Sequence, residues 1–556
     1  MRDAIQAPNV LGMKDHAPPL VPLRPPETVL RLSRMGQMMP TRLSFLRALV
    51  RRLCAERAAV SRTVWDMAPQ GYGRAVYSID LGGHTYSLVA ISTDLPDHKR
   101  SDRVIATAWD AAFVLFDGVP GREDLDRIAA QAPKQEAGRF GPRDLVLSRA
   151  NKSVRMWDAT VAALRAGRQP DPNMIRDIGY LMRTTAVYGN GKFGIADRHL
   201  IADRPGLKGP FAAEMLTVYL IRHFTLDLVQ HVGGAPLEPD LARHLGIGNA
   251  TGLGMAPFLV NHPVLLHNWM HARETALARI IGRAVMTDTQ AERLLQLAYR
   301  ARAHLADWHV PAEDHNAILR QLEADWDAFL PIFDAPQFFG ALWQAAQSRS
   351  DSLQELLAAL LIEVCPEDVD DLAASMGDPF GPLVTPFSDT DAVKHAIARD
   401  WAWALNCDYE VEDQCRRFWY VSAAKLEPRL GDRFAEPGAD LESPLDIARR
   451  VAQLNADLPD RPTPVSDFTA AYAQHAHAIA RVALLARYPY AEIRDNLIGA
   501  TCRPIDMLRC KLSYFGATKF DPKSDLWTRI TLAQGAPLAH ELRPEMDDWW
   551  LPVMER

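Results

Sequence analysis

The feature that most limits the possible folds is a helical spacing of apolar residues over most of the chain after residue 144. Segment after segment has apolar side chains three or four positions apart, and glycine or proline separates one segment from the next. This spacing places the apolar side chains on one face of a helix. The segments with this spacing are 171–188, 210–232, 263–286, 288–309, 312–330, 337–364, 389–406, 409–431, 443–457, 466–487 and 490–513. The sequence therefore predicts a mainly α fold with an all-α body.

One stretch near the N-terminus alternates like a β-hairpin instead. Residues 74–92, RAVYSIDLGGHTYSLVAIS, contain two β-rich runs joined at Gly82 and Gly83. Paired glycines accept the positive φ angles of a two-residue hairpin turn. The stretch 104–118, VIATAWDAAFVLFDG, fits a strand or a helix, and its alanines and length favour a helix. We therefore expect only a minor α+β part.

The length implies several packed units, because the chain has 556 residues and single cores stop growing at ~250–300 residues. Repeated prolines followed by arginines predict a Pro-rich lead-in and basic helical arm over 1–66. The hairpin region covers 67–143 and a helical core covers 144–376. The proline- and glycine-rich stretch GDPFGPLVTPFSDTD begins a C-terminal helical domain, 377–556.

Composition and charge exclude several classes of protein. The chain is 48% hydrophobic and 24% charged, with a net charge of -7, as expected for an ordinary soluble protein. No apolar run reaches the ~18 residues of a membrane span, and the N-terminal residues have no hydrophobic signal region. Six cysteines without a CxxC pair indicate free thiols in a reducing compartment. We expect a cytoplasmic protein with no membrane partner.

The arm has the opposite charge from the rest of the chain. Between residues 24 and 62 there are two glutamates, Glu27 and Glu56, and nine arginines: Arg24, Arg31, Arg34, Arg42, Arg47, Arg51, Arg52, Arg57 and Arg62. Such an arm binds RNA or an acidic partner, forms a solvated face, or pairs with a neighbouring subunit. The negative charge of the whole chain argues against nucleic acid as the main partner. The proline-led arm predicts a homo-oligomer held through the arm.

The first candidate site is RTTAVYGNGKFGIADR, residues 183–198. The preceding helix is predicted to end at Gly189, and three glycines follow within six residues. Cationic and amide groups there would bind a carboxylate or phosphate, while a phenol or carboxylate would move a proton. The predicted binding residues are Arg183, Asn190, Lys192 and Arg198, and the predicted catalytic residues are Tyr188 and Asp197. The alternative is a helix end and a surface turn.

The second candidate site is GIGNATGLGMAPFLVNHP, residues 246–263, a glycine-rich loop that leads into a helix. The amide groups at a helix N-terminus favour an anion. Asn249, Thr251 and Asn261 would orient a polar ligand group. A long capped turn is the alternative.

The helix after this loop carries His267, His271 and Glu274, spaced to lie along one stripe. Two histidines four residues apart can bind one zinc or iron ion. One of them can instead serve as a general base, or both can be hydrogen-bonded core residues. No Rossmann fingerprint, phosphate loop or nucleophile elbow is present. The cofactor is therefore unknown, with a divalent metal as the candidate.

Two further stretches stay open. Residues 509–520 repeat the order Arg, Tyr, Gly, Lys, Phe found at 183–193, which an internal duplication would explain. Residues 416–433, RRFWYVSAAKLEPRLGDR, interleave aromatic and basic side chains. That pattern is typical of base stacking or of an ordinary packed helix.

These patterns favour an enzyme that acts on a small anionic metabolite by acid–base chemistry. Residues 183–198 and 246–274 would line one cleft. Lyase, isomerase and transferase reactions all fit positioned acids, bases and cations, with a lyase placed first. One alternative is a metal-dependent oxidoreductase using His267, His271 and Glu274. The other is a non-enzymatic scaffold or RNA-contacting protein with a basic arm.

Overall fold

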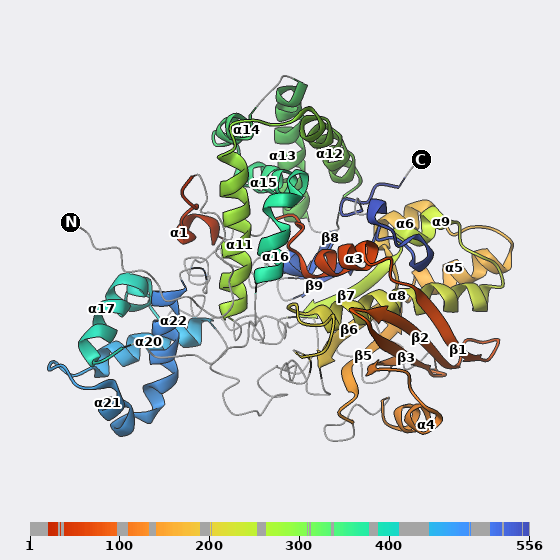
Figure 1. Cartoon of the computed structure of the whole chain (residues 1–556), viewed down its shortest axis with the longest axis horizontal. Coiled ribbons are helices and arrows are strands. Elements are labelled where there is room, and N and C mark those ends of the chain that lie inside the picture. Colours follow the sequence, from red (N-terminus) through yellow and green to blue (C-terminus); the bar gives the residue numbers. More distant parts are fainter. Residues whose placement is uncertain are drawn as a thin grey trace.

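A computed structural model describes residues 21–31, 34, 38–96, 109–132, 141–189, 201, 203–252, 263–308, 310, 313–334, 338–376, 387–410, 444–488, 490, 512–524, 527–546 and 549–554. Figure 1 shows a broad body built around a β-sheet and a smaller group of helices formed by residues 390–487. Within the described ranges, no helix is both long enough and apolar enough to cross a membrane.

A nine-stranded mixed sheet organises the body, in the order β1-β2-β3-β4-β5-β6-β7-β9-β8. The first six strands form an antiparallel meander: β1 (Val60–Met67), β2 (Gly73–Leu81), β3 (His84–Ser92), β4 (Ala111–Asp117), β5 (Asp144–Lys152) and β6 (Tyr180–Gly189). The strand β7 (Gly246–Gly252) lies parallel to β6, and a hairpin of β8 (Lys519–Ser524) and β9 (Trp527–Leu532) completes the far edge. Strands from both ends of the chain therefore share one sheet.

The predicted mainly α fold and all-α body are wrong, because this sheet lies at the centre of the body. Every residue of β4 is buried, so the strand shows an unbroken apolar run without the alternation of a half-exposed strand. The predicted helix 171–188 is instead the short helix α6 (Pro172–Ile178) followed by β6. Gly179 ends α6 with a φ of 75°, a left-handed conformation that favours glycine. Tyr188 thus belongs to a strand, and Gly189 ends that strand.

The predicted hairpin is confirmed. Strands β2 and β3 pair with Leu81 opposite His84, and the two turn residues, Gly82 and Gly83, have φ angles of 63° and 75°. The hairpin is the start of the large sheet, since β1 and β4 extend it on either side.

One long helix covers a face of the sheet. Helix α8 (Ala212–Gly233) is buried around most of its circumference and contacts the strands from β2 to β7. Together with α9 (Pro239–His244), it forms the crossover that a parallel β6–β7 pair requires. Helices α3 (Phe45–Ala55) and α5 (Met156–Arg165) pack on α8. The opposite face is covered by α4 (Arg122–Gln131), whose Leu125 and Ile128 share a core with sheet residues.

A helical layer packs beside the sheet and shares its main hydrophobic core. Helix α15 (Asp351–Val364) lies at its centre, with every residue from Leu353 to Val364 buried. The surrounding elements are α11 (Pro263–Ile281), α12 (Asp288–Asp307), α13 (Glu313–Phe329), η2 (Leu330–Asp334), α14 (Phe339–Ala346), η3 (Pro366–Asp368) and α16 (Asp370–Ser375). The short helix α1 (Pro26–Val29) lies beside α11 (Figure 1).

The group of helices at the left of Figure 1 has a hydrophobic core of its own. Its elements are α17 (Thr390–Asp400), α18 (Ala402–Leu405), α20 (Pro444–Asp457), α21 (Val465–Ala471), η5 (Ala473–His475) and α22 (Ala476–Arg487). The chain then returns to the body through η6 (Ser513–Phe515), β8, β9, η7 (Ala539–Glu541) and η8 (Pro544–Met546). This return brings C-terminal side chains next to β6 and β7.

Candidate anion-binding cavity

The two glycine-rich stretches predicted to meet are neighbouring strands where the structure describes them. In the parallel β6–β7 pair, Arg183 lies opposite Gly248 and Thr184 lies opposite Asn249. The Asn249 Nδ2 donates a hydrogen bond to Thr184 Oγ1 at 3.1 Å. Other members of the predicted set, Asn190, Lys192, Asp197, Arg198 and Asn261 and the side chains of Tyr188 and Thr251, lie outside the described residues, as do 416–433 and Arg509.

A cavity of about 470 Å³ opens where β5 ends, β6 begins and β9 passes. Its volume is within the range of small-molecule sites, ~300–1,000 Å³. The charged side chains that line it are Lys152, Arg155, Arg183, Arg529, Asp171, Asp177 and Asp521. Arg183, predicted to bind an anion, is one of them; the described lining does not include Asn249, His267 or His271.

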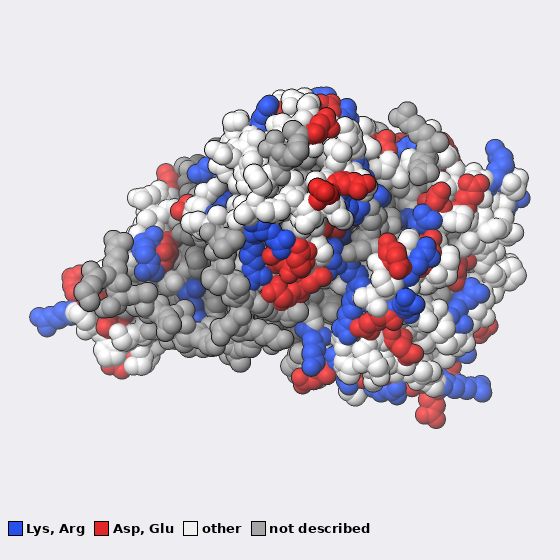
Figure 2. Space-filling model, turned by 45° about the horizontal axis from the view of Figure 1, so that its top comes forward, with Lys and Arg blue, Asp and Glu red and all other residues white. Residues whose placement is uncertain are grey.

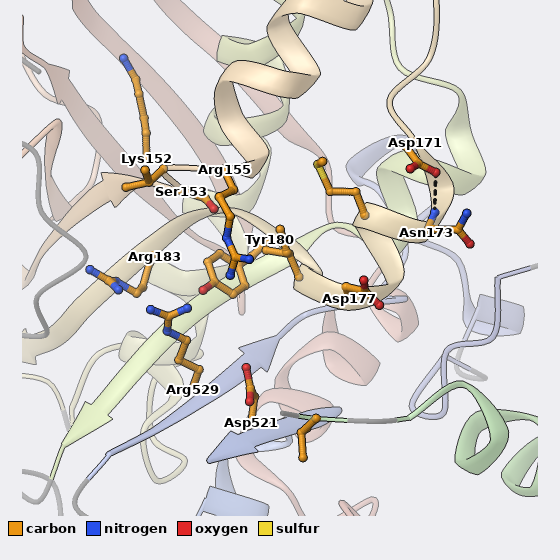
Figure 3. Close-up of a pocket in the computed structure, with 14 residues that line it drawn as sticks. Lys152, Ser153, Arg155, Asp171, Asn173, Asp177, Tyr180, Arg183, Asp521 and Arg529 are labelled. Atoms are coloured by element: carbon orange, nitrogen blue, oxygen red, sulfur yellow. Dashed lines mark hydrogen bonds between the residues drawn. The ribbon is translucent and has the colours of Figure 1, made fainter. Parts of the chain in front are cut away.

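The wall of the cavity changes character from its interior to its mouth. Arg183 and Tyr180 are buried, Arg529 and Asp521 are half-buried, and the side chains at the mouth, including Arg155, are exposed. In Figure 3, Arg155, Arg183 and Arg529 approach the region of Tyr180 from three separate elements, while Asp171 and Asp177 stand on the side of α6. The inner wall is therefore basic and the mouth carries both signs of charge.

An irregularity in β6 brings Tyr180 and Arg183 to the same cavity. Regular alternation would place side chains three positions apart on opposite faces of the sheet. Here the register against β7 moves from Tyr180 opposite Gly246 to Arg183 opposite Gly248, three steps on one strand against two on the other. Such a bulge redirects side chains. A Cβ added at Gly248 would lie 2.6 Å from the Tyr180 ring, so this glycine permits the ring's position.

Helix termini supply two other parts of the wall. Residues 152–155 lead directly into α5, and the Met156 N–H donates to Ser153 Oγ at 3.4 Å. On α6, the Asp171 carboxylate caps the helix by accepting from the Asn173 N–H at 2.9 Å, the bond drawn in Figure 3. The amino end of α5 adds a partial positive charge to the basic wall.

The charge of Lys152 is balanced behind the wall. Its Nζ lies 3.9 Å from Asp110 Oδ1, and both side chains are buried. The ammonium also lies 5.0 Å from the centre of the Trp157 ring, and in Figure 3 it points away from Tyr180. Among the described lining residues, the three arginines are thus the basic groups closest to the centre of the cavity.

The predicted metal ligands lie elsewhere, on α11. The rings of His267 and His271 are stacked at 5.5 Å, and burial, followed by the neighbouring His271, lowers the pKa of His267 to about 3. Glu274 Oε2 accepts from Arg24 Nε at 2.7 Å, and Glu274 Oε1 accepts from Arg273 at 2.9 Å. Two guanidinium groups therefore occupy the carboxylate that a metal ion would use.

Among the described residues, one group of potential ligands is close enough to hold a metal ion. Ligand atoms of Cys365, Glu367 and Asp368 lie within 4.8 Å of one another. Arg283 contacts both carboxylates, at 2.8 Å for Glu367 Oε1 and 2.6 Å for Asp368 Oδ2. Burial raises the pKa of the Cys365 thiol to about 12, and a protonated thiol is a poor ligand. A divalent metal stays a prediction without support from this cluster.

Several arginines of the basic arm fold back onto the helical layer. Arg24 donates to Glu274 on α11 and, through Nη1, to Glu355 Oε1 on α15 at 2.8 Å. Arg34 donates to the same Glu355 oxygen at 2.7 Å. Farther along the arm, Arg47 pairs with Glu363 at 2.5 Å and Arg51 pairs with Asp370. These arginines serve the fold of this chain; the predicted homo-oligomer through the arm stays a prediction.

Charges of both signs are interspersed on the surface as well. Figure 2 shows basic and acidic side chains side by side across the face in view. This pattern differs from the single-sign field that favours nucleic acid.

Three residues of the cavity, Arg155, Tyr180 and Arg529, were missed by the sequence analysis. The alternating stretch WTRITL, residues 527–532, carried the signal of a strand that places Arg529 on one face. Ser153 before α5 marked the helix start beside Arg155. Tyr180 had no such signal, because its position depends on the bulge and on Gly248.

No protein-family model matches the sequence, and no curated protein or solved structure shows a significant similarity to it. The function therefore has to be argued from the residues of the cavity.

Proposed function

We propose that this protein is an enzyme that acts on a small anionic metabolite in the cavity between β5, β6 and β9. The observation that carries the proposal is the approach of Arg155, Arg183 and Arg529, from three elements, to one cavity of about 470 Å³. Guanidinium groups bind carboxylates and phosphates through paired hydrogen bonds. Because Arg183 lies in a buried wall, its attraction for an anion is screened less than in water.

The cavity also holds groups suited to acid–base chemistry. The Tyr180 phenol and the carboxylates of Asp177 and Asp521 line the same space as the arginines, and these are side chains that transfer protons in enzymes. Arg183 and Arg529 would hold the anion while one of these groups exchanges a proton. Lyase, isomerase and transferase reactions remain the candidates, with a lyase placed first, and the cytoplasm is the proposed location.

Calorimetric titration with inorganic phosphate and with succinate tests the proposal. We expect wild-type protein to bind at least one of these anions, and Arg183→Gln to weaken that binding by ~10-fold or more, equal to ~1.4 kcal/mol. The matched control is Arg168→Gln, which removes an exposed arginine that does not line the cavity. Thermal melts of each variant establish that the fold is intact. Equal binding by wild type and Arg183→Gln would contradict the proposal.

A further inference from the structure

We infer that the ligand of this cavity is a phosphate monoester of a small hydroxyl-rich molecule, with the phosphate at the inner wall and the hydroxyl groups at the mouth. This inference rests on the proposed function and narrows its ligand class.

The directions from which the basic groups come favour a phosphate. Arg155 precedes α5, Arg183 lies on β6 and Arg529 lies on β9. A carboxylate offers two oxygens in one plane, which one guanidinium group can satisfy. A phosphate monoester offers three terminal oxygens and a charge of about -1.5 to -2 at neutral pH. Donors from three elements therefore match a tetrahedral dianion better than a planar monoanion.

The mouth of the cavity favours hydroxyl groups on the rest of the ligand. Its exposed side chains include Asp171, Asn173 and Asp177 on α6 and Arg155 opposite them. Carboxylates only accept hydrogen bonds, guanidinium only donates them, and a hydroxyl group does both. An ammonium group would be repelled by Arg155, and an apolar group would displace water from four polar side chains without replacing their hydrogen bonds.

The size of the cavity supports a ligand larger than the anion alone. A volume of about 470 Å³ exceeds what one phosphate fills, since a single water takes up ~30 Å³ of liquid. The part of the ligand beyond the phosphate therefore reaches the polar mouth.

Calorimetric titration of the full chain with four probes tests the inference: glucose 6-phosphate, propyl phosphate, inorganic phosphate and succinate. We expect glucose 6-phosphate to bind ~10-fold more tightly than propyl phosphate, because its hydroxyl groups add hydrogen bonds at the mouth. We expect both esters to bind more tightly than succinate. In Asp177→Asn the ratio of the two ester affinities falls toward one, whereas the exposed control Asp158→Asn on α5 keeps the wild-type ratio.

The outcomes separate this inference from the proposed function. If succinate binds more tightly than either ester and loses affinity in Arg183→Gln, the phosphate class is wrong and the anion site stands. If propyl phosphate binds as tightly as glucose 6-phosphate, the hydroxyl-rich body is wrong. If Arg183→Gln leaves the affinity of every probe unchanged, the proposed function itself fails.

Discussion

Two regions of this molecule are built from arginine and carboxylate side chains, but they differ in the space left between them. In the buried charge network, formed by Arg24, Arg34, Arg273, Glu274 and Glu355, the two glutamate side chains are fully buried. Their oxygens accept from guanidinium groups at distances such as 2.6 Å from Arg273 to Glu355. In the cavity, similar groups border a volume of about 470 Å³.

This difference shows what separates a structural cluster from a candidate site. Burial by itself raises the pKa of Glu355, but the charges of Arg24, Arg273 and Arg34 reverse the effect and hold its pKa well below the ordinary value. The network thus pairs its carboxylates with guanidinium groups of the same chain. A cluster of arginines becomes a candidate site when it faces open volume.

The largest effect is expected from breaking the network. Glu355→Ala removes the acceptor shared by three buried or partly buried guanidinium groups, and losing one partner of a buried ion pair costs ~3–5 kcal/mol. Urea denaturation measures the loss of unfolding free energy. The control Glu292→Ala on α12, at an exposed position, should stay within ~0.5 kcal/mol of wild type. Similar values for both variants would contradict a structural role for the network.

The second effect is a loss of stability in acid. The pKa of Glu355 is lowered in the folded state, so its contribution is present above the unfolded pKa of ~4.3 and is lost as the pH falls toward the folded value. We expect wild-type stability to decrease below pH ~4.3, and Glu355→Gln to decrease less steeply over the same range. Urea melts at stepped pH values measure both slopes. Parallel slopes would show that Glu355 is not responsible.

The third effect concerns the packing that places Tyr180 in the cavity. Gly248→Ala puts a methyl group 2.6 Å from the Tyr180 ring, and overpacking of this kind costs ~1–3 kcal/mol. We also expect weaker anion binding, because the displaced ring enters the cavity. Gly121→Ala is the control, since its Cβ would approach nothing closer than Asp124 Oδ2 at 3.8 Å. Urea melts and calorimetry of both variants measure the two effects, and unchanged values for Gly248→Ala would oppose the packing argument.

The smallest effect on stability is expected where the cavity itself is changed. Arg529 is half-buried, and partly exposed ion pairs contribute ~0–1 kcal/mol, so Arg529→Gln should change the unfolding free energy by less than ~1 kcal/mol. The same substitution at Arg34 in the network should cost more than that, and anion affinity should fall only in Arg529→Gln. Parallel urea melts and titrations test this contrast, which fails if Arg34→Gln affects anion binding equally.

Local patterns predicted the local elements of this fold. The hairpin at Gly82 and Gly83 follows from the turn chemistry of paired glycines. Helix α12 begins at Thr287, whose side chain accepts from the Gln290 N–H in a capping box. These elements depend on contacts between residues close together in the sequence, which periodicity and capping patterns report directly.

The sheet and the cavity depend on contacts between distant residues, which such patterns do not report. The stretch GIGNATG is typical of a loop because of its glycines, yet it forms the central strand β7. A Cβ at Gly246 would lie 2.4 Å from Leu532 O, so glycine there allows close approach of the strand β9. Arg183 was predicted from its own segment, whereas Arg529 reaches the cavity only because the C-terminal hairpin joins the sheet.

A crystal structure with bound tungstate would test the central claim most directly, since the anomalous signal of tungsten locates a tetrahedral oxyanion without ambiguity. We expect the main anomalous peak inside the cavity, with tungstate oxygens within hydrogen-bonding distance of Arg183 and Arg529, and no such peak in crystals of Arg183→Gln. Tungstate bound only at other surfaces, with the cavity containing solvent alone, would contradict an anion site between β5, β6 and β9.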